Sequence, residues 1–204
     1  MLSSGPVATW IFGYGSLIFR PSFPVVERRT AALAGYARRF WQGSIDHRGT
    51  PEAPGRVVTL IEAPGATCVG VAYRIAPDDE EAVLAHLDVR EQNGYERLRR
   101  PLLLDDPPAE PCGAPAGSLG ASARLRGSPA EAVDGLVYLA GPTNPSFLGP
   151  APLEQIARQI AASQGPSGSN AAYLLSLADA LRALDAPDEH VFALESLVRG
   201  MLSP

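Results

Sequence analysis

The order in which strand-like and helix-like segments follow one another constrains the fold of this chain most. Short runs of β-branched and aromatic residues, separated by Gly and Pro, fill the first half and are typical of strands joined by turns. Longer segments that begin after Pro or Gly breaks fill the last third and are typical of helices. Strands first and helices last predict an α+β fold, in which a curved or closed, mainly antiparallel sheet packs against helices.

The expected elements can be placed by residue number. Strands are expected at residues 9–14, 28–33, 36–41, 57–62, 68–74, 95–104 and 132–139, and helices at 77–91, 153–163, 170–184 and 188–201. A polar loop at 43–56 interrupts the strands, and ordered loops of this length often carry function. Residues 105–130 are rich in Pro, Ala, Gly and Ser. Because the strand at 132–139 resumes the earlier pattern, we expect residues 1–204 to form a single domain.

Composition and charge exclude several functions. The chain of 204 residues carries 17 basic and 22 acidic side chains, and its net charge of −5 argues against non-specific nucleic-acid binding. Every basic residue is arginine. The chain therefore lacks the lysine of a Schiff base, a pyridoxal-phosphate site or a Walker A loop.

Metal and membrane binding are not expected either. The cysteines and histidines stand apart in the sequence, at Cys68, Cys112, His47, His86 and His190. They lack the spacing of a zinc site, so we expect no metal. No apolar run approaches the ~20 residues that span a bilayer, and residues 1–7 lack the features of a signal peptide. We expect a cytoplasmic protein with no membrane partner.

Glu91 is the first candidate catalytic residue. In the helix expected at 77–91, Leu84, Leu87 and Glu91 fall on one face, with Val83 at its edge. With the leucines in the core, the Glu91 carboxylate is partly desolvated, which raises its pKa and makes it a base near neutral pH. The alternative is a structural salt bridge to a nearby arginine: Arg90, Arg97 or Arg99.

The second candidate is the Gly-Tyr-Gly-Ser turn at residues 13–16, which follows the first expected strand. Its backbone N–H groups can face outward and bind an anion or an oxyanion. We expect Gly15 to allow close approach of the substrate and to adopt a positive φ. A competing hypothesis makes Ser16 a nucleophile with His47 as its base, without the Gly-x-Ser-x-Gly context of hydrolases.

Several segments, taken in order, resemble one family. They are IFGYGSLIF at 11–19, GYARRFWQGSIDHRGTPEAPGRVVTL at 35–60, GVAYR at 70–74, LDVREQNGY at 87–95, NPSFLGPAPLEQIA at 144–157, GPSGSN at 165–170 and HVFALESLV at 190–198. This order resembles the ChaC family of glutathione-specific γ-glutamylcyclotransferases. The resemblance covers nearly the whole chain except residues 1–8 and a stretch at about 105–130 that looks like an insertion. The chain departs from the family at Phe19, where tryptophan is common, and at residues 92–93.

The resemblance implies a fold, a reaction and a site. The fold would be γ-glutamylcyclotransferase-like, a small β-barrel with flanking helices, and the enzyme would cleave glutathione to 5-oxoproline and cysteinylglycine. Glu91 matches the family's catalytic glutamate. The family's substrate-binding turn matches Ile11, Phe12, Gly13, Tyr14, Gly15 and Ser16. The implied partner is a small molecule, with no cofactor and no metal.

In this reaction the α-amine of the γ-glutamyl group attacks that group's own side-chain amide. We expect Glu91 to take a proton from the ammonium and return it to the leaving amine, and the backbone N–H groups of residues 14–16 to stabilise the oxyanion. Arg48 or Arg56 could bind a substrate carboxylate. The alternatives are a cyclotransferase for other γ-glutamyl amides, a non-catalytic small-molecule-binding protein of the same fold, and a serine hydrolase.

Overall fold

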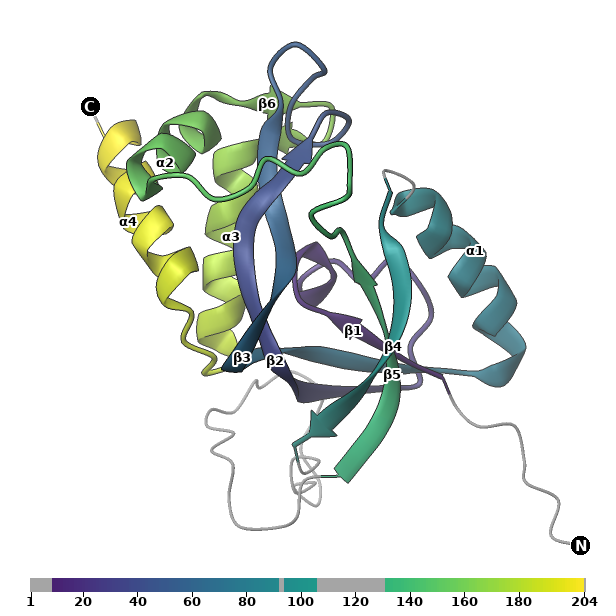
Figure 1. Cartoon of the computed structure of the whole chain (residues 1–204). Helices are drawn as coiled ribbons and strands as arrows, with labels where there is room; N and C mark the ends of the chain where they lie inside the picture. The colour runs from purple at the N-terminus through teal and green to yellow at the C-terminus, as the bar shows by residue number, and fades with distance from the viewer. Residues whose placement is uncertain (1–8, 92–93, 106–130, 204) are drawn as a thin grey trace, which may run out of the picture.

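A closed barrel of β-strands forms the centre of the molecule (Figure 1), in a computed structural model that describes residues 9–91, 94–105 and 131–203. Its strands are β1 (Thr9–Gly13), β2 (Glu27–Ser44), β3 (Gly55–Ile75), β4 (Glu96–Leu104) and β5 (Glu131–Leu139). They are hydrogen-bonded in the order β1-β3-β2-β4-β5. The pairs are antiparallel except β1 with β5, which are parallel and close the barrel. The expected α+β fold with a small barrel is confirmed.

Strands β2 and β3 are longer than the sequence pattern predicted. Each was expected as two short strands, and each is continuous in the structure. The break is an irregularity in the register, which moves from Ala34 opposite Thr67 to Tyr36 opposite Glu62, so that one residue of β2 lies opposite four of β3. Gly35 lies between these pairs with φ +80°, a conformation that side-chain-bearing residues rarely adopt, so it bends the ribbon without ending it. The long ribbon carries the loop at residues 45–54 at its end.

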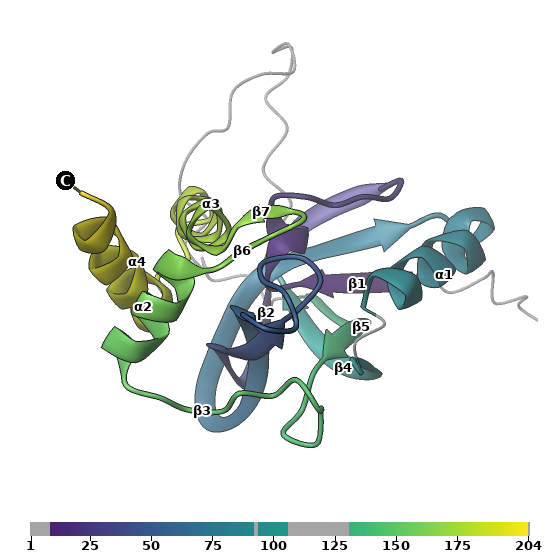
Figure 2. The same cartoon turned by 90° about the horizontal axis from the view of Figure 1, so that it is seen from above.

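Four α-helices flank the barrel on two sides (Figures 1 and 2). Helix α1 (Glu80–Arg90), preceded by the short helix η2 (Pro77–Asp79), lies on one side. Helices α2 (Leu153–Ala162), α3 (Asn170–Ala183) and α4 (Glu189–Leu202) lie together on the other, against β2 and β3. These bounds agree with the predicted helices to within about a turn. The remaining short elements are η1 (Ser16–Ile18), β6 (Gln164–Gly165) and β7 (Gly168–Ser169).

Two buried clusters hold these layers together. The larger one joins the barrel to helices α2–α4 through side chains such as Phe40, Leu60 and Leu177. The smaller one, which contains Ile11 and Leu87, joins β1 to α1. Leu87 is fully buried, so the last turn of α1 is anchored against the barrel next to the end of β1. The predicted excursion at 105–130 lies, from residue 106 onward, outside the described residues.

Candidate active site

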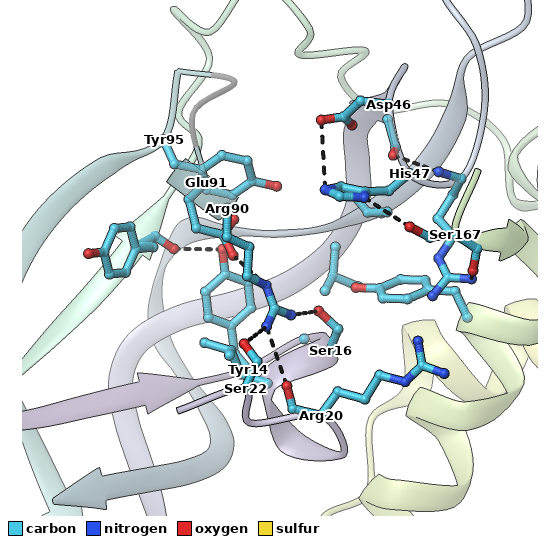
Figure 3. Close-up of a pocket in the computed structure, with 18 of the residues that line it drawn as sticks. Tyr14, Ser16, Arg20, Ser22, Asp46, His47, Arg90, Glu91, Tyr95 and Ser167 are labelled. Atoms are coloured by element: carbon cyan, nitrogen blue, oxygen red, sulfur yellow. Dashed lines mark hydrogen bonds and ion pairs between the residues drawn. The ribbon is translucent and has the colours of Figure 1, made fainter. Parts of the chain in front are cut away.

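A cavity of about 650 Å³ opens where the end of α1, the turn after β1, the loop at 45–54 and the start of α3 meet (Figure 3). This volume is within the ~300–1,000 Å³ typical of small-molecule sites. Five of the predicted site residues line it, namely Phe12, Tyr14, Gly15, Ser16 and Glu91. The structure thus brings together the two candidate features, which are far apart in the sequence.

Glu91 is the C-terminal capping residue of α1, and its backbone N–H donates to the Leu87 carbonyl over 2.8 Å. Its side chain is only 19% exposed. Burial raises the pKa of the Glu91 carboxyl, and Asp46 raises it further, while the Arg90 guanidinium opposes both. The predicted desolvated carboxylate at the end of a buried helix face is therefore present.

Arg90 links this carboxylate to the glycine turn. Its Nε lies 3.4 Å from Glu91 Oε1, and its Nη2 donates to Ser16 Oγ over 2.7 Å (Figure 3). The other two arginines considered for a salt bridge are engaged elsewhere, Arg97 with Asp88 and Arg99 with Asp134. Glu91 therefore forms a salt bridge with Arg90 and can still act as a base, because the pKa of its carboxyl stays raised despite the nearby guanidinium.

The turn presents its backbone to the cavity. Arg38 Nε donates to the Tyr14 carbonyl over 2.6 Å, which holds this carbonyl, and the Tyr14 hydroxyl donates to the Tyr138 carbonyl over 2.8 Å. Within the described ranges, the N–H groups of Gly15, Ser16 and Leu17 have no hydrogen-bond acceptor. These groups are placed as donors to a bound anion or oxyanion.

The expected positive φ at Gly15 is wrong. Its φ is −122°, so the left-handed conformation is not the reason for glycine here. The reason is space, because a Cβ on Gly15 would lie 2.9 Å from Val58 Cγ2 and 3.1 Å from the Tyr173 hydroxyl oxygen. Any side chain at this position would press into the wall of the cavity.

Two of the predicted substrate-binding residues, Ile11 and Gly13, lie outside the cavity lining. Ile11 is fully buried in the smaller core cluster together with Leu87. Gly13 ends β1, where a Cβ would lie 2.8 Å from the Cβ of Leu17. Neither residue contacts the cavity, and both support the turn by packing.

The structure does not pair Ser16 with His47. The Ser16 hydroxyl accepts from Arg90, whereas His47 Nδ1 lies 3.0 Å from Ser167 Oγ and its Nε2 lies 3.7 Å from Asp46 Oδ2. Figure 3 shows the two groups on different walls of the cavity. A serine hydrolase built on Ser16 and His47 has no geometric support.

Only one of the two arginines considered for carboxylate binding reaches the cavity. Arg48 lines it, with its Nη1 donating to the Ser167 carbonyl over 2.7 Å and burial lowering its pKa. Arg56 instead donates to Gln159 Oε1 and to the Phe40 carbonyl and does not line the cavity. Arg48 is thus the arginine placed to meet a bound carboxylate.

Sequence reasoning missed several lining residues: Arg20, Tyr95, Tyr138, Ser167 and Tyr173. Tyr95 and Ser167 lie inside segments that resemble the family, so that resemblance was the one available signal. In the described part of the chain, no three His, Cys, Asp or Glu side chains gather as a metal site. No helix there is long and apolar enough to cross a membrane.

Comparison with known proteins places these observations in a family. A family model described as ChaC-like protein matches residues 9–201. Gamma-glutamylcyclotransferase 2-3 of Arabidopsis thaliana is 43% identical over 97% of this chain and 92% of its own length. Human glutathione-specific gamma-glutamylcyclotransferase 1 is 41% identical, over 97% of this chain and 81% of its own. A crystal structure of the yeast γ-glutamylcyclotransferase specific to glutathione matches with a TM-score of 0.81 at 33% identity, covering 95% of this chain and 96% of that chain.

Proposed function

This chain belongs to the ChaC-like family, and we propose that its cavity splits glutathione into 5-oxoproline and cysteinylglycine. The observation that carries the proposal is the position of Glu91. A carboxylate whose pKa is raised by burial shares one cavity with a turn whose N–H groups lack acceptors among the described residues. That pair is what an amide-cleaving cyclisation needs, namely a base for the amine and donors for the oxyanion.

The first chemical step forms the ring. The α-amine of the γ-glutamyl group is mostly an ammonium at neutral pH, and Glu91 takes its proton. The freed lone pair attacks the γ-carbonyl carbon, a new C–N bond closes the five-membered ring, and the carbonyl oxygen becomes an oxyanion. The N–H groups of Gly15, Ser16 and Leu17 stabilise that oxyanion. Holding the flexible γ-glutamyl chain in its cyclising conformation lowers the barrier further.

The second step releases the dipeptide. The oxyanion collapses, the original amide C–N bond breaks, and Glu91 returns its proton to the departing amine of cysteinylglycine. Glu91 is thereby regenerated as a carboxylate. The ring nitrogen, which still carries two hydrogens and a positive charge after the attack, loses its second proton to solvent and becomes the lactam N–H. The salt bridge to Arg90 supports this cycle because it favours the ionised form that starts it.

Substrate recognition is assigned to the remaining walls. Arg48 is proposed to bind a substrate carboxylate, and Arg20, which also lines the cavity, supplies a second cation. A small molecule is thus the proposed partner. The expected lack of a nucleic-acid partner, based on the net charge of −5, remains a prediction, as do the expected lack of a membrane partner and the cytoplasmic location.

The assay for this proposal measures 5-oxoproline. The purified full-length protein is incubated with glutathione and, separately, with γ-glutamylalanine. We expect 5-oxoproline from glutathione and much less from γ-glutamylalanine. Equal release from both would indicate a cyclotransferase for γ-glutamyl amides in general. Release from neither would contradict the proposal and favour a non-catalytic binding protein.

A further inference from the structure

Tyr173, on the first turn of α3, holds its ring rigidly in the wall of the cavity. The residue is 5% exposed. Phe40 meets the ring edge-on at 5.9 Å between centroids, and Phe19 packs at 6.3 Å. The Arg48 guanidinium lies over the ring at 5.4 Å from its centroid. With contacts on several sides, the hydroxyl has a fixed position.

That position is next to the glycine turn. A Cβ built on Gly15 would lie 3.1 Å from the Tyr173 hydroxyl oxygen, so the hydroxyl lies close to the backbone of the turn. The turn is the segment whose N–H groups are proposed to bind the oxyanion. Gly15 and Tyr173 are far apart in the sequence. This part of the cavity wall is therefore formed by two elements, the turn after β1 and the first turn of α3.

The backbone of Val58 acts on the Tyr173 hydroxyl as a hydrogen-bonding partner and lowers the pKa of the phenol. The register between β2 and β3 shifts between Arg39 and Gln42. Gln42 pairs with Val57, so the neighbouring residue Val58 lies at this irregularity. Tyr173 lines the cavity, so its hydroxyl proton can be donated to a bound ligand there.

The phenol stays protonated at neutral pH. Burial, reinforced by the nearby Glu91 carboxylate, raises the pKa of Tyr173 to about 12, against the opposing effect of the Val58 hydrogen bond. The side chain is therefore a neutral donor throughout the range in which Glu91 works as a base, and it cannot compete with Glu91 for the amine proton.

We infer that Tyr173 is a catalytic residue, whose hydroxyl donates a hydrogen bond to the oxyanion formed during cyclisation, together with the N–H groups of the Gly15 turn. This inference rests on the proposed cyclotransferase function. A donor of this kind acts on the transition state, because the ground-state amide oxygen carries less charge, so its loss reduces kcat more than it affects KM.

The test compares Tyr173→Phe with a matched control, Tyr36→Phe. Phenylalanine keeps the ring contacts and removes only the hydroxyl. Tyr36 is a buried tyrosine whose hydroxyl accepts from Arg100 and which does not line the cavity. We expect Tyr173→Phe to lower kcat for glutathione by about 10²–10³-fold with KM nearly unchanged, the effect typical of losing one oxyanion donor. Tyr36→Phe should keep the unmodified protein's kcat.

A second replacement separates donating from structural support. 3-Fluorotyrosine at position 173 keeps the ring and hydroxyl but is a stronger donor and a weaker acceptor than tyrosine. A donor to the oxyanion predicts a kcat at or above that of the unmodified protein. A lower kcat would overturn the inference, since it would mean that accepting a hydrogen bond is what matters. An unchanged kcat in Tyr173→Phe would overturn it as well. If the unmodified protein itself forms no 5-oxoproline, the proposed function fails instead.

Discussion

At Glu91, burial and a neighbouring guanidinium act on one carboxylate in opposite directions. Burial is the larger effect and raises the pKa of the Glu91 carboxyl. Arg90, whose Nε lies 3.4 Å from Glu91 Oε1, favours the ionised carboxylate and opposes part of that increase. A base in this state gains activity as the pH rises through its pKa, because only the carboxylate can accept the ammonium proton. The acid limb of the rate profile should therefore lie above the ordinary pKa of a glutamate.

Replacing Glu91 by glutamine tests that role. The amide keeps the shape of the side chain and removes the base, so we expect kcat for glutathione to fall by about 10²–10⁴-fold, the span typical of positioned acid–base groups. The rate should also lose its rise with pH. Circular dichroism and the thermal midpoint serve as the folding control. A glutamine variant with ordinary activity would mean that another group takes the proton.

The glycine turn gives a paired prediction at Gly15 and Ser16. A methyl group at Gly15 would meet Val58 and the Tyr173 hydroxyl, so Gly15→Ala should displace the turn and reduce kcat by at least 10²-fold, comparable to losing an oxyanion donor. Ser16→Ala removes only the hydroxyl that accepts from Arg90 and keeps the backbone N–H. It should reduce kcat far less.

Both variants must first be shown to be folded, because the turn directly follows the buried barrel strand β1. If Ser16→Ala were the inactive variant and Gly15→Ala retained activity, the serine hydroxyl would have a direct chemical role, and the backbone would not be the oxyanion site.

At the scale of elements, α4 docks on β2 through polar contacts at its first turn. Asp188, its N-cap, accepts from Arg38 over 2.8 Å, and Arg38 in turn holds the Tyr14 carbonyl. His190 Nε2 accepts from the Phe40 N–H over 3.1 Å. Burial, helped by Arg39, lowers the pKa of His190 to about 4. A protonated imidazole could not accept this hydrogen bond.

This contact predicts a pH-dependent stability. The unfolded chain protonates His190 near its ordinary pKa of 6.5, whereas the folded protein resists until about pH 4. Its stabilisation is therefore full above about pH 6.5 and declines as the pH falls toward 4. His190→Gln keeps an acceptor oxygen without titrating. Between pH 7.5 and 4.5, urea unfolding should show the histidine protein losing about 2 kcal/mol more than the variant. Parallel losses in both proteins would contradict the assignment.

The elements were largely predictable because their signals are local. The helix expected at 170–184 and the face carrying Leu87 and Glu91 both follow from residues within one or two turns. The continuity of β2 and β3 was not predictable in this way. Whether a glycine such as Gly35 ends a strand or bulges depends on the partner strand, and the pairing is a tertiary property.

The site divides along the same line. Glu91 and the Gly15 turn were predicted because each lies in a short segment whose residue types alone indicate its role, a carboxylate on an apolar helix face and a glycine-rich turn after a strand. Tyr173 and the bond from Arg90 to Ser16 were missed because they join segments far apart in the sequence, which only the closed barrel brings into contact. Ser16 and His47 illustrate the converse, since a plausible pair of residue types proved to occupy different walls.

At the scale of the whole molecule, the barrel holds the two helical sides apart and the cavity lies between them. The side of α1 supplies Glu91, and the side of α3 supplies Tyr173 (Figure 2 shows both helices around the barrel). The base and the Tyr173 hydroxyl therefore come from different helices, and the turn after β1 connects them, since Ser16 accepts from Arg90 and Gly15 lies close to Tyr173.

The central claim is that the substrate's own amine is the nucleophile, and glutathione acetylated at the γ-glutamyl α-amine tests it most directly. The scissile amide is intact in this compound, and only the internal nucleophile is lost. Inhibition of glutathione cleavage by the compound would show that it enters the cavity. We expect that no cysteinylglycine is released from it. Release at a rate comparable to that from glutathione would contradict the account, because water or an enzyme side chain would then have to be the nucleophile.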